Sequence, residues 1–127
     1  MDAKICGIKD SYTLNYLIAH NNFPKFIGFI VNYAKSKRYI ELDKLKKLID
    51  VKKKEVKFVA VLVNPKENIL EKIKNLNFDY YQLYDVDANT TKFIKEKYNK
   101  KIISALTIEN KNDVEKYKEY ELISDIV

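Results

Sequence analysis

The feature that most constrains the fold of this chain is a regular alternation between short apolar runs and longer amphipathic stretches. The run at residues 58–63, FVAVLV, is apolar at every position, which is typical of a strand buried on both faces of a parallel sheet. Comparable runs recur along the whole chain, at residues 4–8, 26–31, 57–63, 80–84 and 102–108, and a sixth begins at residues 126–127. These runs predict the strands of one sheet.

The stretches between the runs carry apolar residues at the spacing of an amphipathic helix. Leu42, Leu45 and Ile49 share one face, and a later stretch begins with Asn64 as a cap and Pro65 in the first turn. Strands that alternate with helices predict parallel pairing with right-handed crossovers. The pattern fits both a closed (β/α)8 barrel and an open doubly wound sheet. With only two glycines, the chain has no Gly-rich phosphate loop after its first strand, which disfavours the dinucleotide-binding sheet.

Length and composition place the chain among globular proteins. Its 127 residues can form one domain with a core, although a complete (β/α)8 barrel needs about 200 residues or more. A content of 46% hydrophobic and 33% charged residues excludes a disordered chain. No apolar run approaches the roughly 18 residues of a membrane span, and the first residues lack the apolar stretch of a secretory signal. We therefore expect a cytoplasmic protein without a membrane partner.

The cysteine and histidine counts and the net charge of the chain limit which metals and ligands it could bind. The sequence has one cysteine, Cys6, and one histidine, His20, so no internal disulfide can form and a zinc site with three or four such ligands is disfavoured. The formal net charge of +6 attracts small anions as well as nucleic acid. Many lysines lie in mixed-charge stretches such as residues 42–57, which is the pattern of a solvated helix face. We therefore expect no metal and no nucleic-acid partner.

In parallel α/β folds the functional site lies at the carboxyl ends of the strands. That rule selects Cys6 near the end of the first run, Arg38 in the long loop after the second, and Asn64 at the end of the third. It also selects Gln82 and Tyr84 at the end of the fourth run, with Asp85 just beyond. The Arg38 guanidinium matches the geometry of a carboxylate or a phosphate, and a thiol beside a cation can act as a base. Each residue also has a structural interpretation, since a lone cysteine is usually a small buried hydrophobe and Arg38 could simply belong to a solvated loop.

Five segments, taken in order, resemble one known family. They are KICGI at residues 4–8, GF at 28–29, KSKRYI at 35–40, VAVLVN at 59–64 and YYQLY at 80–84. Together they resemble phosphoribosylanthranilate isomerase of tryptophan biosynthesis, and the pair KICGI and SKRY is the most specific part. The resemblance implies an α/β fold of the parallel (β/α)8 TIM-barrel type. Residues 1–127 would be a single domain, the N-terminal portion of that barrel, with about five βα units and the start of a sixth strand.

The resemblance also implies a reaction and its residues. The family carries out an Amadori rearrangement of N-(5-phosphoribosyl)anthranilate to 1-(2-carboxyphenylamino)-1-deoxyribulose 5-phosphate, an intramolecular aldose–ketose isomerisation without a metal or an organic cofactor. By motif, Cys6 corresponds to the general base, and Arg38 and Gln82 correspond to substrate-binding residues. The partner is the sugar-phosphate substrate that carries anthranilate. The resemblance leaves the oligomeric state open.

The sequence departs from the family pattern in two places that matter for the chemistry. The family usually has Gln-Leu-His-Gly where residues 82–85 read Gln-Leu-Tyr-Asp, so Tyr84 stands in place of an imidazole. The family's general acid is an aspartate at the end of the sixth strand, which lies beyond Val127. Asp125 precedes that strand, at the edge of a barrel that serves stability rather than catalysis, and is not assigned a role.

For the 127 residues alone we expect open strand edges, one uncovered side of the core, marginal stability, a tendency to associate, and no isomerase activity. The alternative is a non-catalytic half-barrel that self-associates or completes its sheet with a partner. A different sugar-phosphate enzyme of the barrel class is a further hypothesis, which the KICGI and SKRY pair disfavours. A basic RNA-binding domain is another, disfavoured because the chain has no aromatic-basic recognition motif.

Overall fold

The computed structural model describes residues 2–127 and contains one parallel sheet. Its strands are β1 (Lys4–Cys6), β2 (Phe26–Val31), β3 (Tyr39–Ile40), β4 (Lys57–Val63), β5 (Tyr80–Tyr84) and β6 (Lys101–Ala105). Hydrogen-bonded neighbours follow the order β1-β2-β4-β5-β6, and β3 pairs with β2. Every pair is parallel. The α/β class and the parallel sheet predicted from the alternating runs are therefore confirmed.

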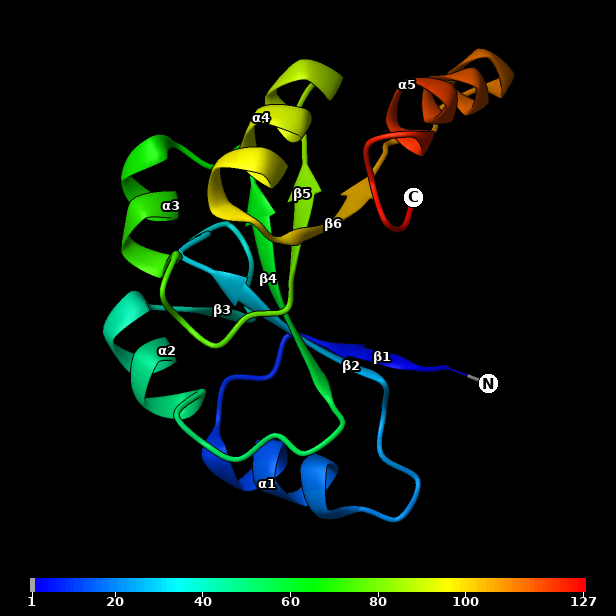
Figure 1. The fold of residues 1–127 in the computed structure, drawn as a ribbon. Helices are drawn as coiled ribbons and strands as arrows, with labels where there is room; N and C mark the ends of the chain where they lie inside the picture. Colours follow the sequence, from blue (N-terminus) through cyan, green and yellow to red (C-terminus); the bar gives the residue numbers. More distant parts are fainter. Residues whose placement is uncertain (1) are drawn as a thin grey trace.

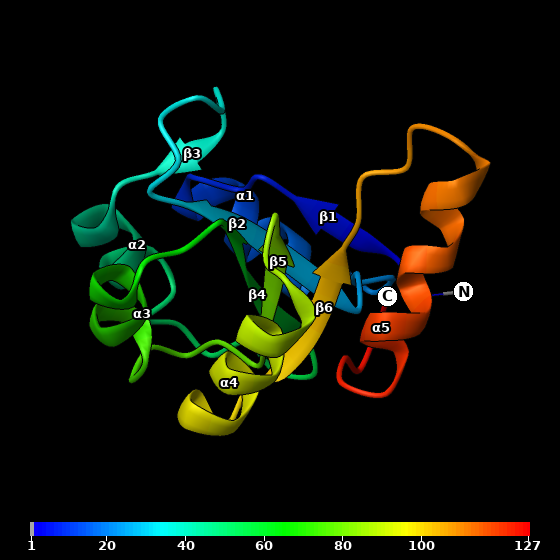
Figure 2. The same cartoon turned by 90° about the horizontal axis from the view of Figure 1, so that it is seen from above.

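Helices connect the strands and cover one side of the sheet. They are α1 (Ser11–Ala19), α2 (Leu42–Leu48), α3 (Glu67–Ile73), α4 (Ala88–Tyr98), the 3-10 helix η1 (Lys111–Lys116) and α5 (Tyr117–Glu121). Figures 1 and 2 show α2, α3 and α4 side by side along the outside of the curved sheet, and α5 apart from them beyond β6. Among residues 2–127, no helix combines the length and the apolar content that crossing a bilayer requires.

The two faces of the sheet carry separate apolar clusters, because successive strand residues point to opposite sides. The larger cluster joins the sheet to α1–α4, and its fully buried strand residues include Ile27, Phe29, Phe58, Tyr81 and Ile102. The smaller cluster lies on the inner side of the curve and consists of Phe26, Ile30, Val59, Val61 and Ile103. Both sides of the sheet are therefore apolar, as the continuous apolar runs predict.

The inner side of the curve was expected to be uncovered, and that expectation is wrong for the described residues. Val59 is completely buried, and Phe26 and Ile103 are each only 9% exposed. The rings of Phe26 and Tyr80 meet edge to face with their centroids 5.3 Å apart. The sheet curves enough that side chains on its inner side pack against one another, and this closes most of the apolar surface.

Several details of the predicted elements differ from the structure, beginning with the first and fifth runs, which end earlier than predicted, at Cys6 and Ala105. The helix after β4 begins at Glu67 rather than directly after Asn64, and its N-cap residue, Lys66, makes no side-chain hydrogen bond. Asn64 instead has a left-handed backbone (φ 39°), and its N–H donates to the carbonyl oxygen of Tyr84 at 2.8 Å, which prolongs the β4–β5 pairing. The loop after β2 contains β3, which the sequence does not mark because two residues are too few to show a periodicity.

The last residues of the chain return to the sheet beside β6. Ile126 forms a parallel bridge with Ile103. The Asp125 carboxylate accepts a hydrogen bond from the N–H of Ile102 (2.8 Å) and forms an ion pair with Lys95 (2.9 Å). Burial acts to raise the pKa of Asp125, but these two contacts hold it below its usual range. Asp125 therefore lies near the amino end of β6, on the edge predicted for it.

Candidate functional site

The chain makes the same kind of turn at the carboxyl ends of four strands. The first residue after β1, β2, β4 and β5 has a positive φ: Gly7 (86°), Asn32 (50°), Asn64 (39°) and Asp85 (55°). Glycine, asparagine and aspartate enter this left-handed region more readily than other residues. The sequence carries the signal as one of these residues at or directly after the end of each run, but the alternation of runs does not reveal it. These turns shape the rim on which the predicted site lies.

Cys6 is the last residue of β1, and its side chain lies over Gly28 of the neighbouring strand. A Cβ atom at Gly28 would lie 3.1 Å from Cys6 Sγ and 3.1 Å from Lys4 Nζ, which is closer than packing normally allows. The missing side chain at Gly28 therefore provides the space for the thiol. Cys6 is partly buried on the inner side of the sheet, where it contacts the smaller apolar cluster.

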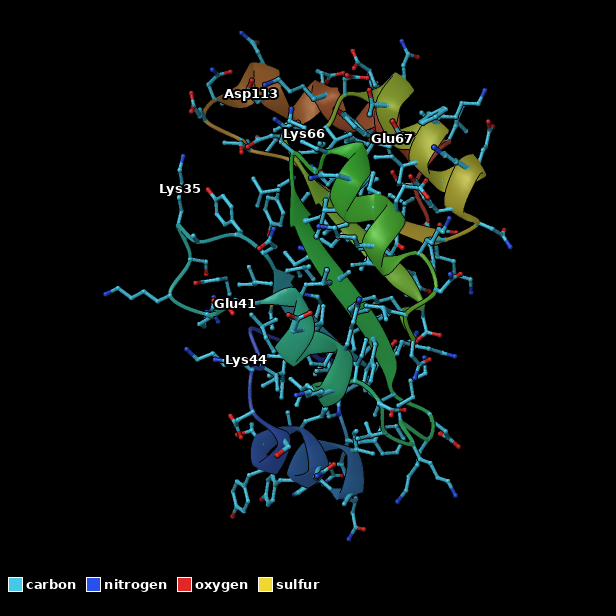
Figure 3. All side chains as sticks on the ribbon, turned by 90° about the vertical axis from the view of Figure 1, so that its left-hand side faces the viewer. Lys35, Glu41, Lys44, Lys66, Glu67 and Asp113 are labelled. Carbon is cyan, nitrogen blue, oxygen red and sulfur yellow. The ribbon has the colours of Figure 1, made fainter. Side chains whose placement is uncertain are left out.

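Arg38 lies in the loop between β2 and β3 and reaches back over the end of β1. Its Nη1 donates a hydrogen bond to the carbonyl oxygen of Cys6 at 3.2 Å. A Cβ atom at Gly7 would lie 2.8 Å from Arg38 Cδ, so both this close approach and the left-handed φ require glycine there. The backbone N–H of Arg38 donates to Ser36 Oγ (3.2 Å), which stabilises the loop. In Figure 3, Lys35 of the same loop points away from the sheet.

A cavity of about 330 Å³ lies at the carboxyl ends of the strands. Its polar lining residues are Cys6, Tyr33, Ser36, Arg38, Tyr84, Asp85 and Thr107. The structure thus brings Cys6, Arg38 and Tyr84 to one place, as strand-end reasoning leads one to expect. Tyr33, Ser36 and Thr107 were not selected from the sequence, because a loop hydroxyl has no distinguishing pattern. A thiol, a guanidinium, a phenol and a carboxylate around one cavity can transfer a proton and recognise an anion.

Gln82 lies behind this cavity rather than in its wall. It is 8% exposed and stands between Val61 and Ile103 in the β5 register. Its Nε2 donates a hydrogen bond to Tyr84 Oη at 3.1 Å. Its Oε1 is buried and has no hydrogen-bond partner among residues 2–127. The predicted binding residue Gln82 is therefore connected to the cavity through Tyr84.

The remaining candidate, Asn64, lies apart from Cys6 and Arg38. It lines a separate cavity of about 290 Å³ between the ends of β2 and β4, together with Asn32 and Pro65. Within the described part of the chain, no group of three or more His, Cys, Asp or Glu side chains is placed to hold a metal ion. The site that the structure assembles is therefore the cavity beside Cys6.

Parallel βα units with a polar cavity at the carboxyl ends of the strands are the features of the TIM-barrel class of α/β proteins. No protein-family model matches the chain. The N-(5′-phosphoribosyl)anthranilate isomerase of Thermoanaerobacter sp. (strain X514) is 37% identical over 122 residues, which is 95% of this chain. The protein of that name from Clostridium acetobutylicum is 34% identical over 128 residues, 98% of the chain. Homologues thus confirm the resemblance to this family, although the chain spans only 57% and 58% of these two relatives' lengths.

Solved structures agree with this comparison. Phosphoribosylanthranilate isomerase from Thermotoga maritima superposes with a TM-score of 0.82 at 25% identity, over 97% of this chain and 58% of that one. A structure of this enzyme in complex with reduced 1-(o-carboxyphenylamino)-1-deoxyribulose 5-phosphate gives the same TM-score and identity, and the chain covers 62% of it. The enzyme from Thermococcus kodakaraensis, at 20% identity and a TM-score of 0.72, supports the fold alone; the match covers 99% of this chain and 61% of that one.

Proposed function

We propose that this chain belongs to an N-(5′-phosphoribosyl)anthranilate isomerase of tryptophan biosynthesis. The observation that carries the proposal is the meeting of Cys6 and Arg38 at one cavity, with Arg38 Nη1 3.2 Å from the Cys6 carbonyl oxygen. This pairs a group able to remove a proton with a group able to bind an anion. The homologues of that name support the same assignment. One free cysteine suits the reducing cytoplasm, where we expect the enzyme to act.

In the proposed reaction, protonation of the furanose ring oxygen opens the sugar to a Schiff base. Cys6 then acts as the general base and takes the proton from C2′. The electrons of that C–H bond form the C1′–C2′ double bond, and the resulting enolamine rearranges to the aminoketose. Arg38 binds the carboxylate of the anthranilate group through its forked N–H donors. Gln82 supports binding from behind the cavity wall.

We assign no residue among positions 2–127 to the general acid. The Asp125 carboxylate is held by Ile102 and Lys95 near the amino end of β6, whereas Cys6 lies at the carboxyl end of β1. We therefore expect these 127 residues on their own to be inactive. Turnover by the isolated 127-residue chain would contradict this part of the proposal.

The first experiment is to weigh the protein made in its source cell and to assay protein of that length with N-(5′-phosphoribosyl)anthranilate. A complete small barrel would weigh about 22–25 kDa, against 15.0 kDa for this chain. We expect turnover at the larger mass, and Cys6→Ala should lower kcat by at least about 100-fold because the general base is lost. A folded protein of that mass without any turnover would refute the proposal.

A second comparison tests the role of Arg38 in anion binding. Arg38→Met should raise KM by about 10–100-fold, because it removes charge-assisted hydrogen bonds to the carboxylate. Lys35→Met is the matched control, since it removes one positive charge from the same loop at a side chain that points away from the sheet (Figure 3). Equal effects of the two substitutions would indicate that only the charge of the loop matters.

One observation favours the alternative, a non-catalytic half-barrel that associates through its own surface. Apolar side chains after β6 are open to solvent: Leu122 is 96% exposed, and Ile108 and Val114 are each 50% exposed. In this case the natural protein would have a mass of 15.0 kDa and would form dimers or larger species at micromolar concentration. The subunit mass of the protein from its source cell, measured together with its sedimentation velocity, decides between the two functions.

A further inference from the structure

We propose that Tyr84 determines specificity at this site, and that Gln82 positions the Tyr84 hydroxyl to donate a hydrogen bond to an uncharged oxygen of the substrate's sugar. The inference rests on the proposed function, which supplies the sugar. Both residues lie on the inner face of β5, two positions apart. Tyr84 is 36% exposed and lines the cavity, whereas Gln82 is 8% exposed and lies behind it.

The direction of the Gln82–Tyr84 hydrogen bond determines whether the Tyr84 hydroxyl can donate a hydrogen bond to a ligand. Gln82 Nε2 donates to Tyr84 Oη over 3.1 Å. A phenol carries one proton and accepts through a lone pair. Because the amide occupies the accepting side, the phenolic proton must point elsewhere. None of the hydrogen bonds within residues 2–127 uses that proton, so Tyr84 is an unused donor.

The neighbours of Tyr84 in the sheet offer no acceptor for its hydroxyl proton, which leaves the cavity as the place for an acceptor. In the sheet register Tyr84 stands between Val63 and Ala105. Neither of these side chains can accept a hydrogen bond. Val63 also lines the cavity together with Cys6, so Tyr84 and Cys6 border the same space. The geometry therefore fits a ligand oxygen on the cavity side of the Tyr84 ring.

An unpaired atom on Gln82 is the second observation. Its Oε1 is buried and has no partner among the described residues, although the rest of the carboxamide is engaged with Tyr84. Buried polar atoms in native proteins nearly always have partners, and exceptions cluster where a ligand or a water completes a network. The hydrogen bond to Tyr84 is therefore the contact that orients the Gln82 carboxamide within the described residues.

The charges around the cavity indicate which part of the substrate meets Tyr84. Arg38 supplies a positive group on the Cys6 side, and Asp85 follows Tyr84 and lines the same cavity. A carboxylate next to Tyr84 repels an anionic ligand group but accepts a hydrogen bond from a hydroxyl. The carboxylated ring of the substrate therefore belongs beside Arg38, and the hydroxylated sugar belongs beside Tyr84.

The test measures ligand affinity by calorimetry on protein of the length made in its source cell. The probes are reduced 1-(o-carboxyphenylamino)-1-deoxyribulose 5-phosphate, which contains the sugar, and anthranilate alone, which does not. Tyr84→Phe removes only the hydroxyl and should raise the Kd of the first probe by about three- to tenfold, with the Kd of anthranilate unchanged. Arg38→Met should weaken both probes. Tyr80→Phe is the control, because Tyr80 lies at the other end of β5 against Phe26.

A second variant tests the positioning role of Gln82. In Gln82→Glu a carboxylate faces Tyr84 and accepts a hydrogen bond from its hydroxyl, so the hydroxyl can no longer donate to a ligand. This variant should weaken the sugar-containing probe about as much as Tyr84→Phe, and the double variant should be no weaker than either single one. Thermal unfolding shows whether each variant is folded. If the Gln82 variant does not fold, the Tyr84→Phe comparison across the two probes decides alone.

The outcomes separate this inference from the proposed function. Unchanged affinity of folded Tyr84→Phe for the sugar-containing probe overturns the inference, whatever the turnover. An equal loss for anthranilate alone also overturns it, because the hydroxyl would then serve the ring. A third outcome combines three results: the wild type binds the sugar-containing probe, Tyr84→Phe binds that probe more weakly, and no turnover occurs. In that case the inference stands and the isomerase proposal fails. A wild-type protein that does not bind the probe overturns both.

Discussion

Helices α1–α4 and the segment after β6 (residues 106–127) have similar amphipathic sequence patterns, but the structure places them in different environments. Each of the first four helices buries two residues in the core under the sheet: Leu14 and Ile18, Leu45 and Leu48, Leu70 and Ile73, Thr91 and Ile94. Helices η1 and α5 bury none. Both kinds of segment contain apolar residues, so the difference lies in whether a sheet face is present for them to cover.

Polar contacts, rather than apolar packing, hold the segment after β6 in place. Tyr120 Oη donates to the carbonyl oxygen of Val86 at 2.8 Å, and Lys95 Nζ donates to that of Ile123 at 2.9 Å. Such exposed or partly buried contacts contribute little net free energy, since water competes for the same groups. We infer that this segment opens separately from the rest of the molecule.

The largest expected difference between the two regions is in amide hydrogen exchange. Amides of β4, in the centre of the sheet, should exchange only by global unfolding, whereas those of η1 and α5 should exchange by local opening. Protection factors should therefore differ by at least about 1,000-fold. Exchange measured by NMR on the 127-residue chain checks this. Equal protection in both regions would mean that the segment after β6 is covered in solution.

A matched pair of leucine substitutions sharpens the comparison at the level of stability. Leu45→Ala, at a completely buried position in α2, should lower the free energy of unfolding by about 2–5 kcal/mol. Leu122→Ala, at a position 96% exposed, should change it by less than about 0.5 kcal/mol. Urea titrations give both values, and Ile27→Val, with an expected cost of about 0.5–1.5 kcal/mol, replaces Leu45→Ala if that variant does not fold. A large cost at Leu122 would reveal an interface over α5.

The sequence predicts the first region well and the second poorly, for a physical reason. The run at residues 58–63 and the stripe with Leu45 repeat at periods set by local backbone geometry, so a linear pattern reveals strand and helix. Whether Val114 or Leu122 becomes buried depends on a distant partner surface, which no local period encodes. Val59, on the inner side of the sheet, was expected to be uncovered but is completely buried. Its burial depends on the curvature of the sheet and on cross-strand packing, which no local period encodes either.

The candidate site likewise has a part that the sequence predicts and a part that only the structure shows. Cys6 and Arg38 were found because parallel strands place their carboxyl ends on one edge and because their motifs are specific. The requirement for Gly28 beneath the thiol and the order of the Gln82–Tyr84 hydrogen bond come from side-chain geometry across neighbouring strands. These contacts link residues by register, and the sequence alone does not give the register.

Two tyrosine hydroxyls allow a finer test of the comparison. Tyr98 Oη donates to Glu71 Oε1 at 2.9 Å and so joins α4 to α3, whereas Tyr120 Oη joins α5 to the loop after β5. Tyr98→Phe should lower the free energy of global unfolding by about 0.5–1.5 kcal/mol. Tyr120→Phe should leave global unfolding unchanged and speed amide exchange in η1 and α5. The comparison fails if Tyr120→Phe shifts the urea midpoint as much as Tyr98→Phe does.

The smallest expected effect is the pH dependence that comes from the surface carboxylates of the two regions. Hydrogen bonds from Lys74 and Tyr98 lower the pKa of Glu71 to about 2; the first lies at the end of α3 itself, and the second connects α3 to α4. Because this pKa is lower in the folded than in the unfolded chain, the contribution is fully present above the unfolded value of 4.5 and is lost as the pH falls toward 2.

Asp113 provides the counterpart in the second region, since its pKa is also lowered, chiefly by Lys116 three residues later within η1. Glu71→Gln should therefore flatten the acid side of the global stability profile, whereas Asp113→Asn should leave that profile unchanged. Urea midpoints between pH 5 and pH 2, at low and high salt, check both, and salt should shrink the Glu71 effect because the pair is exposed. A flattened profile in Asp113→Asn would mean that η1 unfolds together with the sheet, which would contradict the independence of the two regions.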